Sequence, residues 1–67
     1  MPSKKMIGDR LRYLRGETPR DVVCKACDIS LSALTMYELG ERLPRDEVKV
    51  KLAAYYRNTV QAIFFTC

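Results

Sequence analysis

The sequence predicts an all-α fold, a compact bundle of five short helices in a single domain. Three observations lead to this expectation. Apolar residues recur every three or four positions along several stretches, residues that start and stop helices stand at the ends of these stretches, and no strand pattern is evident. The 67 residues are enough for one small core, and no repeat or low-complexity linker divides them.

The start of the chain is polar and includes a helix breaker, which predicts a flexible basic arm over residues 1–5 and a domain over residues 6–67. Lys4 and Lys5 in this arm either lie along a phosphate backbone or remain in solvent. Within residues 1–20, Lys and Arg outnumber Asp and Glu by six to two. This end of the chain is therefore a candidate for contact with a polyanion.

The first helix is predicted over residues 6–15, because Ile7, Leu11 and Leu14 recur at helical spacing and form one apolar stripe. A second helix is predicted over residues 19–27. Its expected N-cap is Thr18, followed by a proline at the first helical position and an acid in the first turn.

A tight turn follows the second helix. Asp28 is expected to adopt a left-handed conformation there, which Asp tolerates better than most residues. The third helix is predicted over residues 30–39, with Ser30 as its N-cap and Gly40 as the left-handed residue that ends it. Five apolar side chains of this region are spaced to converge on one core: Val23, Cys27, Ile29, Leu34 and Tyr37.

The fourth helix is predicted to open at Arg45 or Asp46 and to end near Asn58, which can adopt the left-handed conformation. Thr59 is the expected cap of a last helix over residues 60–65. These two helices carry more apolar side chains than a small core needs, and surplus apolar surface usually marks a partner.

The run from Cys24 to Pro44, CKACDISLSALTMYELGERLP, resembles the helix-turn-helix of the phage repressor and Cro-like (XRE-type) transcriptional regulators. The predicted first helix, which ends at Arg15, also resembles that of the family. The resemblance implies a lambda-repressor-like fold in which the second and third helices form the helix-turn-helix. It also implies a structural ion pair between Arg15 and Glu38.

The same resemblance implies a surface for duplex DNA. The side chains expected to face bases in the major groove are Ser30, Leu31, Ser32, Thr35 and Met36. Those expected to face phosphates are Lys4, Lys5, Arg20, Arg42 and Arg45. No Arg, Asn or Gln stands among the base-facing positions, so direct readout is expected to be weak and phosphate contacts and DNA shape to carry much of the affinity.

Family members commonly dimerise, so the resemblance implies a homodimer whose two recognition helices read the half-sites of a pseudo-palindrome. The interface is expected at Tyr55, Phe64 and Phe65. The predicted function is therefore a sequence-specific transcriptional regulator, with repression as the expected mode and activation as the open alternative. The alternative is a protein–protein interaction module that keeps the fold and binds through an apolar face at Leu31, Met36 and Leu39.

Three cysteines invite a metal or redox interpretation, since Cys24 and Cys27 form a C-x-x-C pair and Cys67 ends the sequence. Structural zinc requires four ligands, and the chain has no histidine. Cys24 and Cys27 are therefore expected to be small core residues, and Cys67 to be exposed. A thiol switch of binding stays open as a further alternative.

Other function classes lack support in the sequence. The chain has no histidine, no Gly-rich phosphate loop and no nucleophile–base spacing, so we expect neither an enzyme nor a cofactor. No apolar run approaches the ~18 residues that span a bilayer, so no membrane contact is expected and the protein is predicted to be cytoplasmic. No second domain for a small-molecule effector is evident.

Overall fold

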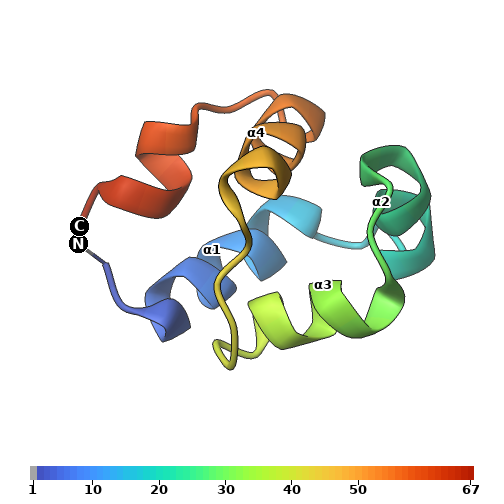
Figure 1. The fold of residues 1–67 in the computed structure, drawn as a ribbon, viewed down its shortest axis with the longest axis horizontal. Coiled ribbons are helices and arrows are strands. Elements are labelled where there is room, and N and C mark those ends of the chain that lie inside the picture. The colour runs from blue at the N-terminus through green and yellow to red at the C-terminus, as the bar shows by residue number, and fades with distance from the viewer. Residues whose placement is uncertain (1) are drawn as a thin grey trace.

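The fold was analysed in a computed structural model that describes residues 2–67. The helices are α1 (Lys4–Arg15), α2 (Arg20–Cys27), α3 (Leu31–Glu38), α4 (Asp46–Tyr55) and a short π-helix η1 (Gln61–Phe65). No strand occurs within residues 2–67, so the all-α prediction is confirmed. α1 packs against α3 and η1, and α2 packs against α3 and α4, with a radius of gyration of 10.4 Å (Figure 1).

The first helix begins earlier than the sequence suggested. Ser3 caps α1, since its Oγ accepts a hydrogen bond from the backbone N–H of Met6 at 3.1 Å. Lys4 and Lys5 therefore form the first turn of α1, and Pro2 is buried. The prediction of a flexible arm is wrong for these residues because Ser3 caps a helix that includes the two lysines. Met1 lies outside the described residues.

The start of α2 also differs from the prediction. Its N-cap is Pro19, which makes no side-chain capping bond, and the helix begins at Arg20. Thr18 instead lies in the connection, where its N–H donates to the Arg15 carbonyl at 3.1 Å and its carbonyl accepts from Arg15 Nη1 at 2.9 Å. These backbone bonds hold Thr18 one residue too far from α2 for the capping role.

The turn between α2 and α3 agrees with the prediction. Asp28 is left-handed, with φ 55° and ψ 49°, and the Ile29 N–H donates to the Cys24 carbonyl at 3.0 Å. Ser30 caps α3 by accepting from the Ala33 N–H at 3.0 Å. Gly40 follows the helix with φ 74°, as expected.

The C-terminal third contains one further difference. Arg57, not Asn58, takes the left-handed conformation after α4, with φ 54°. Asn58 instead accepts a hydrogen bond from the Thr59 N–H through Oδ1 at 2.8 Å. Thr59 caps the last turn as predicted, because its Oγ1 accepts from the Ala62 N–H at 3.0 Å.

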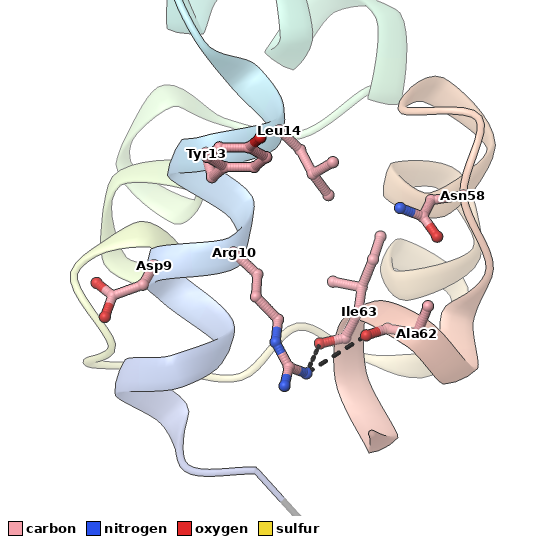
Figure 2. Close-up of a pocket in the computed structure, with 7 residues that line it drawn as sticks. All are labelled: Asp9, Arg10, Tyr13, Leu14, Asn58, Ala62 and Ile63. Carbon is pink, nitrogen blue, oxygen red and sulfur yellow. Dashed lines mark hydrogen bonds between the residues drawn. The ribbon is translucent and has the colours of Figure 1, made fainter. Parts of the chain in front are cut away.

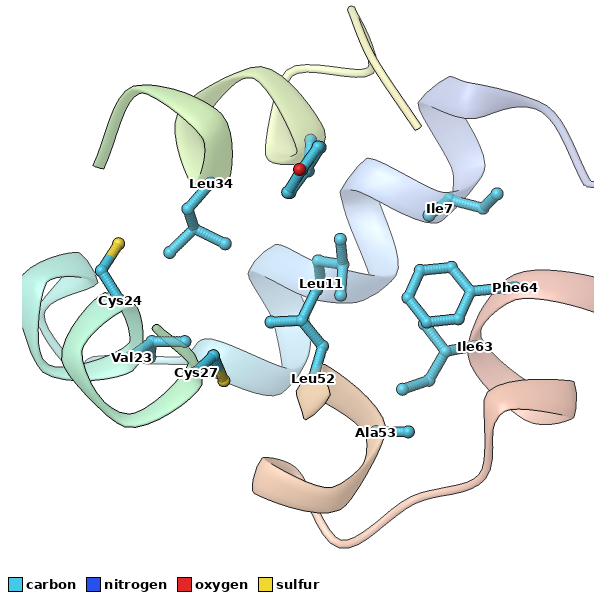
Figure 3. Packing of buried hydrophobic residues seen from close by; sticks show 11 residues of the cluster. Ile7, Leu11, Val23, Cys24, Cys27, Leu34, Leu52, Ala53, Ile63 and Phe64 are labelled. Atoms are coloured by element: carbon cyan, nitrogen blue, oxygen red, sulfur yellow. The ribbon is translucent and has the colours of Figure 1, made fainter. Parts of the chain in front are cut away.

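The core lies between all five helices (Figure 3). It contains the apolar residues that helical spacing in the sequence predicts to converge. Ile29 packs against it from the turn and is only partly buried. The buried apolar residues are Ile7, Leu11, Val23, Cys24, Cys27, Leu34, Tyr37, Leu52, Ala53, Ile63 and Phe64. Because the core holds one side of α3, the opposite side of this helix faces solvent.

Gly8 sets the distance between α1 and α3. A Cβ atom at this position would lie 2.5 Å from the Glu38 carbonyl oxygen and 2.8 Å from that of Tyr37. Only glycine permits such a close approach of two helix backbones. The C-terminal end of α3 therefore rests directly on the backbone of α1.

Candidate functional site

The outward face of α3 is the surface at which the sequence placed the base-facing residues. Ser30, Leu31, Ser32 and Met36 are exposed and Thr35 is half-buried. The opposite side of the helix is buried through Leu34, Tyr37 and Glu38. At 3.6 residues per turn, positions 31, 32, 35, 36 and 39 share one continuous face, which we call the α3 face.

Two of the hydroxyl groups at this surface are engaged by the protein itself. Ser30 Oγ accepts the capping bond from Ala33, and Thr35 Oγ1 donates to the Leu31 carbonyl at 2.8 Å. The apolar residues are more open: 54 % of Leu31, 38 % of Met36 and 55 % of Leu39 are exposed. The α3 face carries no charged side chain, because Glu38 is turned into the protein.

Exposed basic side chains occur in the two segments that adjoin the C-terminal end of α3. Arg42 and Arg45 are exposed in the segment that joins α3 to α4. Lys4 and Lys5 are exposed in the first turn of α1, and a Cβ at Gly40 would lie 2.9 Å from the Lys5 Cα. The start of α1 and the end of α3 are therefore neighbours. Four of the five predicted phosphate-facing residues are exposed: two beside this junction and two in the segment that leads from it to α4.

The fifth, Arg20, makes a contact that the sequence analysis did not anticipate. Its Nε donates to Glu38 Oε1 at 3.0 Å. Arg15 binds the same carboxylate through Nε at 2.7 Å and Nη2 at 3.0 Å, so the expected ion pair is present and has a third member. The Glu38 side chain is fully buried, whereas 34 % of the Arg20 side chain remains exposed.

This buried cluster joins three helices, since Arg15 ends α1, Arg20 begins α2 and Glu38 ends α3. The hydrogen bond to Glu38 raises the pKa of the Arg15 guanidinium, which secures its positive charge. The two arginines and one carboxylate orient α2 and α3 relative to α1. Arg20 thus has a structural role that its sequence position did not reveal.

Tyr56 is a second residue that the sequence did not mark. Among residues 2–67, its hydroxyl is the one buried side-chain polar group without a hydrogen-bond partner. Burial raises the pKa of this phenol, and the negative charge of Glu38 raises it further. The hydroxyl therefore stays protonated beside the cluster, and only the folded structure shows this proximity.

The predicted dimer interface is wrong for Phe64. Its side chain is 0 % exposed and lies in the core, because η1 turns it inward next to Ile63 (Figure 3). Phe65 is 38 % exposed, with Lys49 Nζ 4.9 Å from its ring centroid. Tyr55 is half-buried against the Tyr56 ring. Tyr55 and Phe65 remain predicted interface residues.

An open pocket of about 410 Å³ lies between α1 and η1 (Figure 2). Arg10 stands at one side and donates through Nη1 to the Ile63 carbonyl at 2.9 Å and the Ala62 carbonyl at 3.4 Å. This side chain therefore ties η1 to α1. The lining residues are Asp9, Arg10, Tyr13, Leu14, Asn58, Ala62 and Ile63.

The cysteines occupy the places that the sequence suggested. Cys24 and Cys27 are buried, and Cys67 is exposed. Figure 3 shows the first two sulfur atoms pointing away from each other on α2. Burial raises the pKa of both thiols, which disfavours the reactive thiolate. No group of three or more potential ligands able to hold a metal ion occurs among the described residues.

We expect one fast-reacting thiol in the native protein and three after denaturation. Cys67 should react with Ellman's reagent within the mixing time or shortly after, whereas Cys24 and Cys27 should react only as the protein unfolds. Counting released thiolate with and without denaturant measures this directly, and Cys67→Ser should abolish the fast phase. Fast reaction of the C67S variant would reveal an accessible helix thiol and reopen the thiol switch.

Across residues 2–67, no helix combines the length and apolar character needed to cross a membrane. No family model matches the chain, and neither a curated protein nor a solved structure matches it. The case for a function therefore rests on the geometry of the α3 face and its surroundings.

Proposed function

We propose that this protein is a duplex-DNA-binding transcriptional regulator in which α2 and α3 form a helix-turn-helix. α3 enters the major groove, and the protein acts as a homodimer, in the cytoplasm where bacterial or phage DNA is found. Repression by occupation of an operator is the expected mode. The base-facing side chains are Ser30, Leu31, Ser32, Thr35 and Met36, and the phosphate contacts come from Lys4, Lys5, Arg42 and Arg45.

The observation that carries this proposal is the combination at α3 of an uncharged exposed face and exposed basic residues around it. Leu31, Ser32 and Met36 face outward from a helix that the core and Glu38 hold firmly. A major groove admits an α-helix, and its phosphates flank that helix on both sides. A formal charge of +4 favours the encounter with a polyanion.

The local structure of the turn supports the same proposal. α2 and α3 have eight residues each, and the short turn at Asp28 and Ile29 separates them. Ser30 caps α3 immediately before its exposed residues. Short helices joined in this way present the N-terminal part of the second one to base edges in helix-turn-helix proteins.

A protein–protein interaction module is the second candidate. The observation in its favour is that the three most prominent apolar residues of the α3 face, Leu31, Met36 and Leu39, are between 38 % and 55 % exposed. An apolar helix face can occupy a groove of another protein. The basic residues beside this face favour the DNA candidate over a neutral protein surface.

Fluorescence anisotropy of a labelled random duplex, titrated at two salt concentrations, tests the proposal. Binding should weaken steeply with salt, because each neutralised phosphate releases counterions. Size-exclusion chromatography of the free protein and of the complex should show the dimer. Absence of binding at low salt would refute the DNA-binding function and direct attention to a protein partner.

Removing one phosphate contact gives a sharper prediction. Arg45→Ala should lower affinity about equally for all duplex sequences and reduce the slope of log K against log[salt] by about one. Arg57→Asn is the matched control, since it removes one exposed positive charge far along the chain from α3 and Asn tolerates the left-handed conformation there. A changed sequence preference at unchanged affinity would contradict the assignment of Arg45.

A further inference from the structure

The side chains that the α3 face would present to a DNA duplex are mostly apolar. Leu31 and Met36 are 54 % and 38 % exposed, and no charged or amide side chain shares this face. Bidentate hydrogen bonds, the usual basis of discrimination by Arg, Asn and Gln, are therefore absent from its chemistry. What remains are the hydroxyl groups of Ser32 and Thr35, the hydroxyl of Ser30 just before the helix, and the apolar side chains.

The hydroxyl groups have little capacity left for bases. Ser30 Oγ already accepts the bond that caps α3, and Thr35 Oγ1 has donated its hydrogen to the Leu31 carbonyl. Only the Ser32 hydroxyl is exposed on the face without a role in the helix. A serine hydroxyl accepts and donates, so it fits either kind of base edge and selects poorly.

Aliphatic groups discriminate between bases in one way. In the major groove thymine presents a methyl group at C5, whereas adenine, guanine and cytosine present polar edges. A 5-methylated cytosine carries a methyl group at the same ring position. Burying this methyl against a leucine or methionine side chain removes apolar surface from water, which no unmethylated base can match.

We infer that the α3 face reads C5-methyl groups, so that its preferred sites carry thymine, or 5-methylcytosine, opposite Leu31 and Met36. This inference rests on the proposed DNA-binding function and names the bases that the same surface selects. The occupant is a duplex because of charge complementarity: Lys4 and Lys5 are exposed beside the end of α3, and Arg42 and Arg45 are exposed in the segment that follows it.

The test begins with sites selected from a random duplex library by the wild-type protein. Each enriched thymine is then replaced by uracil, which keeps every hydrogen-bonding group and removes only the methyl. We expect a loss of roughly fourfold in affinity at each contacted position, the free energy of burying one methyl expressed as a binding ratio. A C·G pair at such a position should bind more weakly still, and methylation of its cytosine should restore part of the affinity.

Protein variants identify the side chains responsible. Leu31→Ala and Met36→Ala truncate exposed residues and should leave the fold intact, which circular dichroism and unfolding midpoints will show. Each should bring the ratio of thymine-duplex to uracil-duplex affinity close to one at a single position, whatever it does to the affinity for both duplexes. Val50→Ala, which truncates an exposed apolar residue of α4, is the matched control, and it should keep that ratio.

The outcomes separate this inference from the function on which it rests. Binding that weakens with salt but is equal for thymine and uracil duplexes, or that enriches no site, would overturn methyl readout and leave DNA binding established. Absence of binding to any duplex at low salt would overturn both. A thymine preference that survives the L31A and M36A variants would refute the assignment to these residues.

Discussion

Replacing Glu38 by alanine is expected to lower the free energy of unfolding by about 3–5 kcal/mol, the range found when one partner of a buried ion pair is removed. The reason is the geometry of the cluster. Glu38 is fully buried and accepts hydrogen bonds from Arg15 and Arg20. Without the carboxylate, the Arg15 guanidinium, only 17 % exposed, would keep its charge in the protein interior with no counter-charge.

Urea denaturation of the wild type and of Glu38→Ala and Glu38→Gln measures this effect. Glutamine keeps the shape and one acceptor oxygen but not the charge, so its loss should be smaller than that of alanine. Asp9→Asn serves as the matched control, because Asp9 pairs with Arg12 at the surface and should contribute less than about 1 kcal/mol. If Asp9→Asn and Glu38→Ala lowered the free energy of unfolding by similar amounts, burial would not determine the strength of the Glu38 cluster.

The helices were predictable from the sequence wherever their ends carry local chemistry. Ser30 and Gly40 mark the two ends of α3, and the structure uses both as expected. The start of α1 differs from the prediction because Ser3, in the predicted arm, caps the helix. Thr18 does not cap α2 because Arg15 holds its backbone, a contact that no local sequence pattern indicates.

Some residues of the candidate site were likewise predictable from the sequence, and others were not. Helical spacing alone suffices to place Leu31 and Met36 on the outside and Leu34 on the inside of α3. Arg20 is predicted to face phosphates because arginine is usually exposed, whereas Glu38, 18 positions away, supplies its carboxylate partner. The interface prediction fails at Phe64, because its helical spacing with Val60 and Ile63 directs its side chain into the core. The error at Arg20 concerns a contact between distant segments.

Gly8→Ala is expected to lower the free energy of unfolding by about 1–2 kcal/mol. Helix propensity alone predicts the opposite, a gain of about 1 kcal/mol for replacing an interior glycine of α1 by alanine. However, the new Cβ would lie 2.5 Å and 2.8 Å from two carbonyl oxygens of α3, and backbone atoms cannot move aside as a flexible side chain does. α1 and α3 would have to separate, with a cost like that of overpacking a core.

Thermal and urea unfolding of Gly8→Ala test the sign of this effect. Ala54→Gly, on the exposed side of α4, is the matched control, because it measures propensity without a tertiary contact and should cost about 1 kcal/mol. A G8A variant more stable than the wild type would show that the two helices part easily.

Gly8 and Glu38 should also be coupled. The carbonyl of Glu38 rests on Gly8 while its carboxylate binds Arg15, so α1 holds the end of α3 at two places through one residue. Displacing α3 by the extra methyl would already weaken the Arg15–Glu38 bonds. The double variant Gly8→Ala/Glu38→Gln should therefore lose less stability than the two single losses predict together. Strict additivity would mean that the backbone contact and the ion cluster position α3 independently.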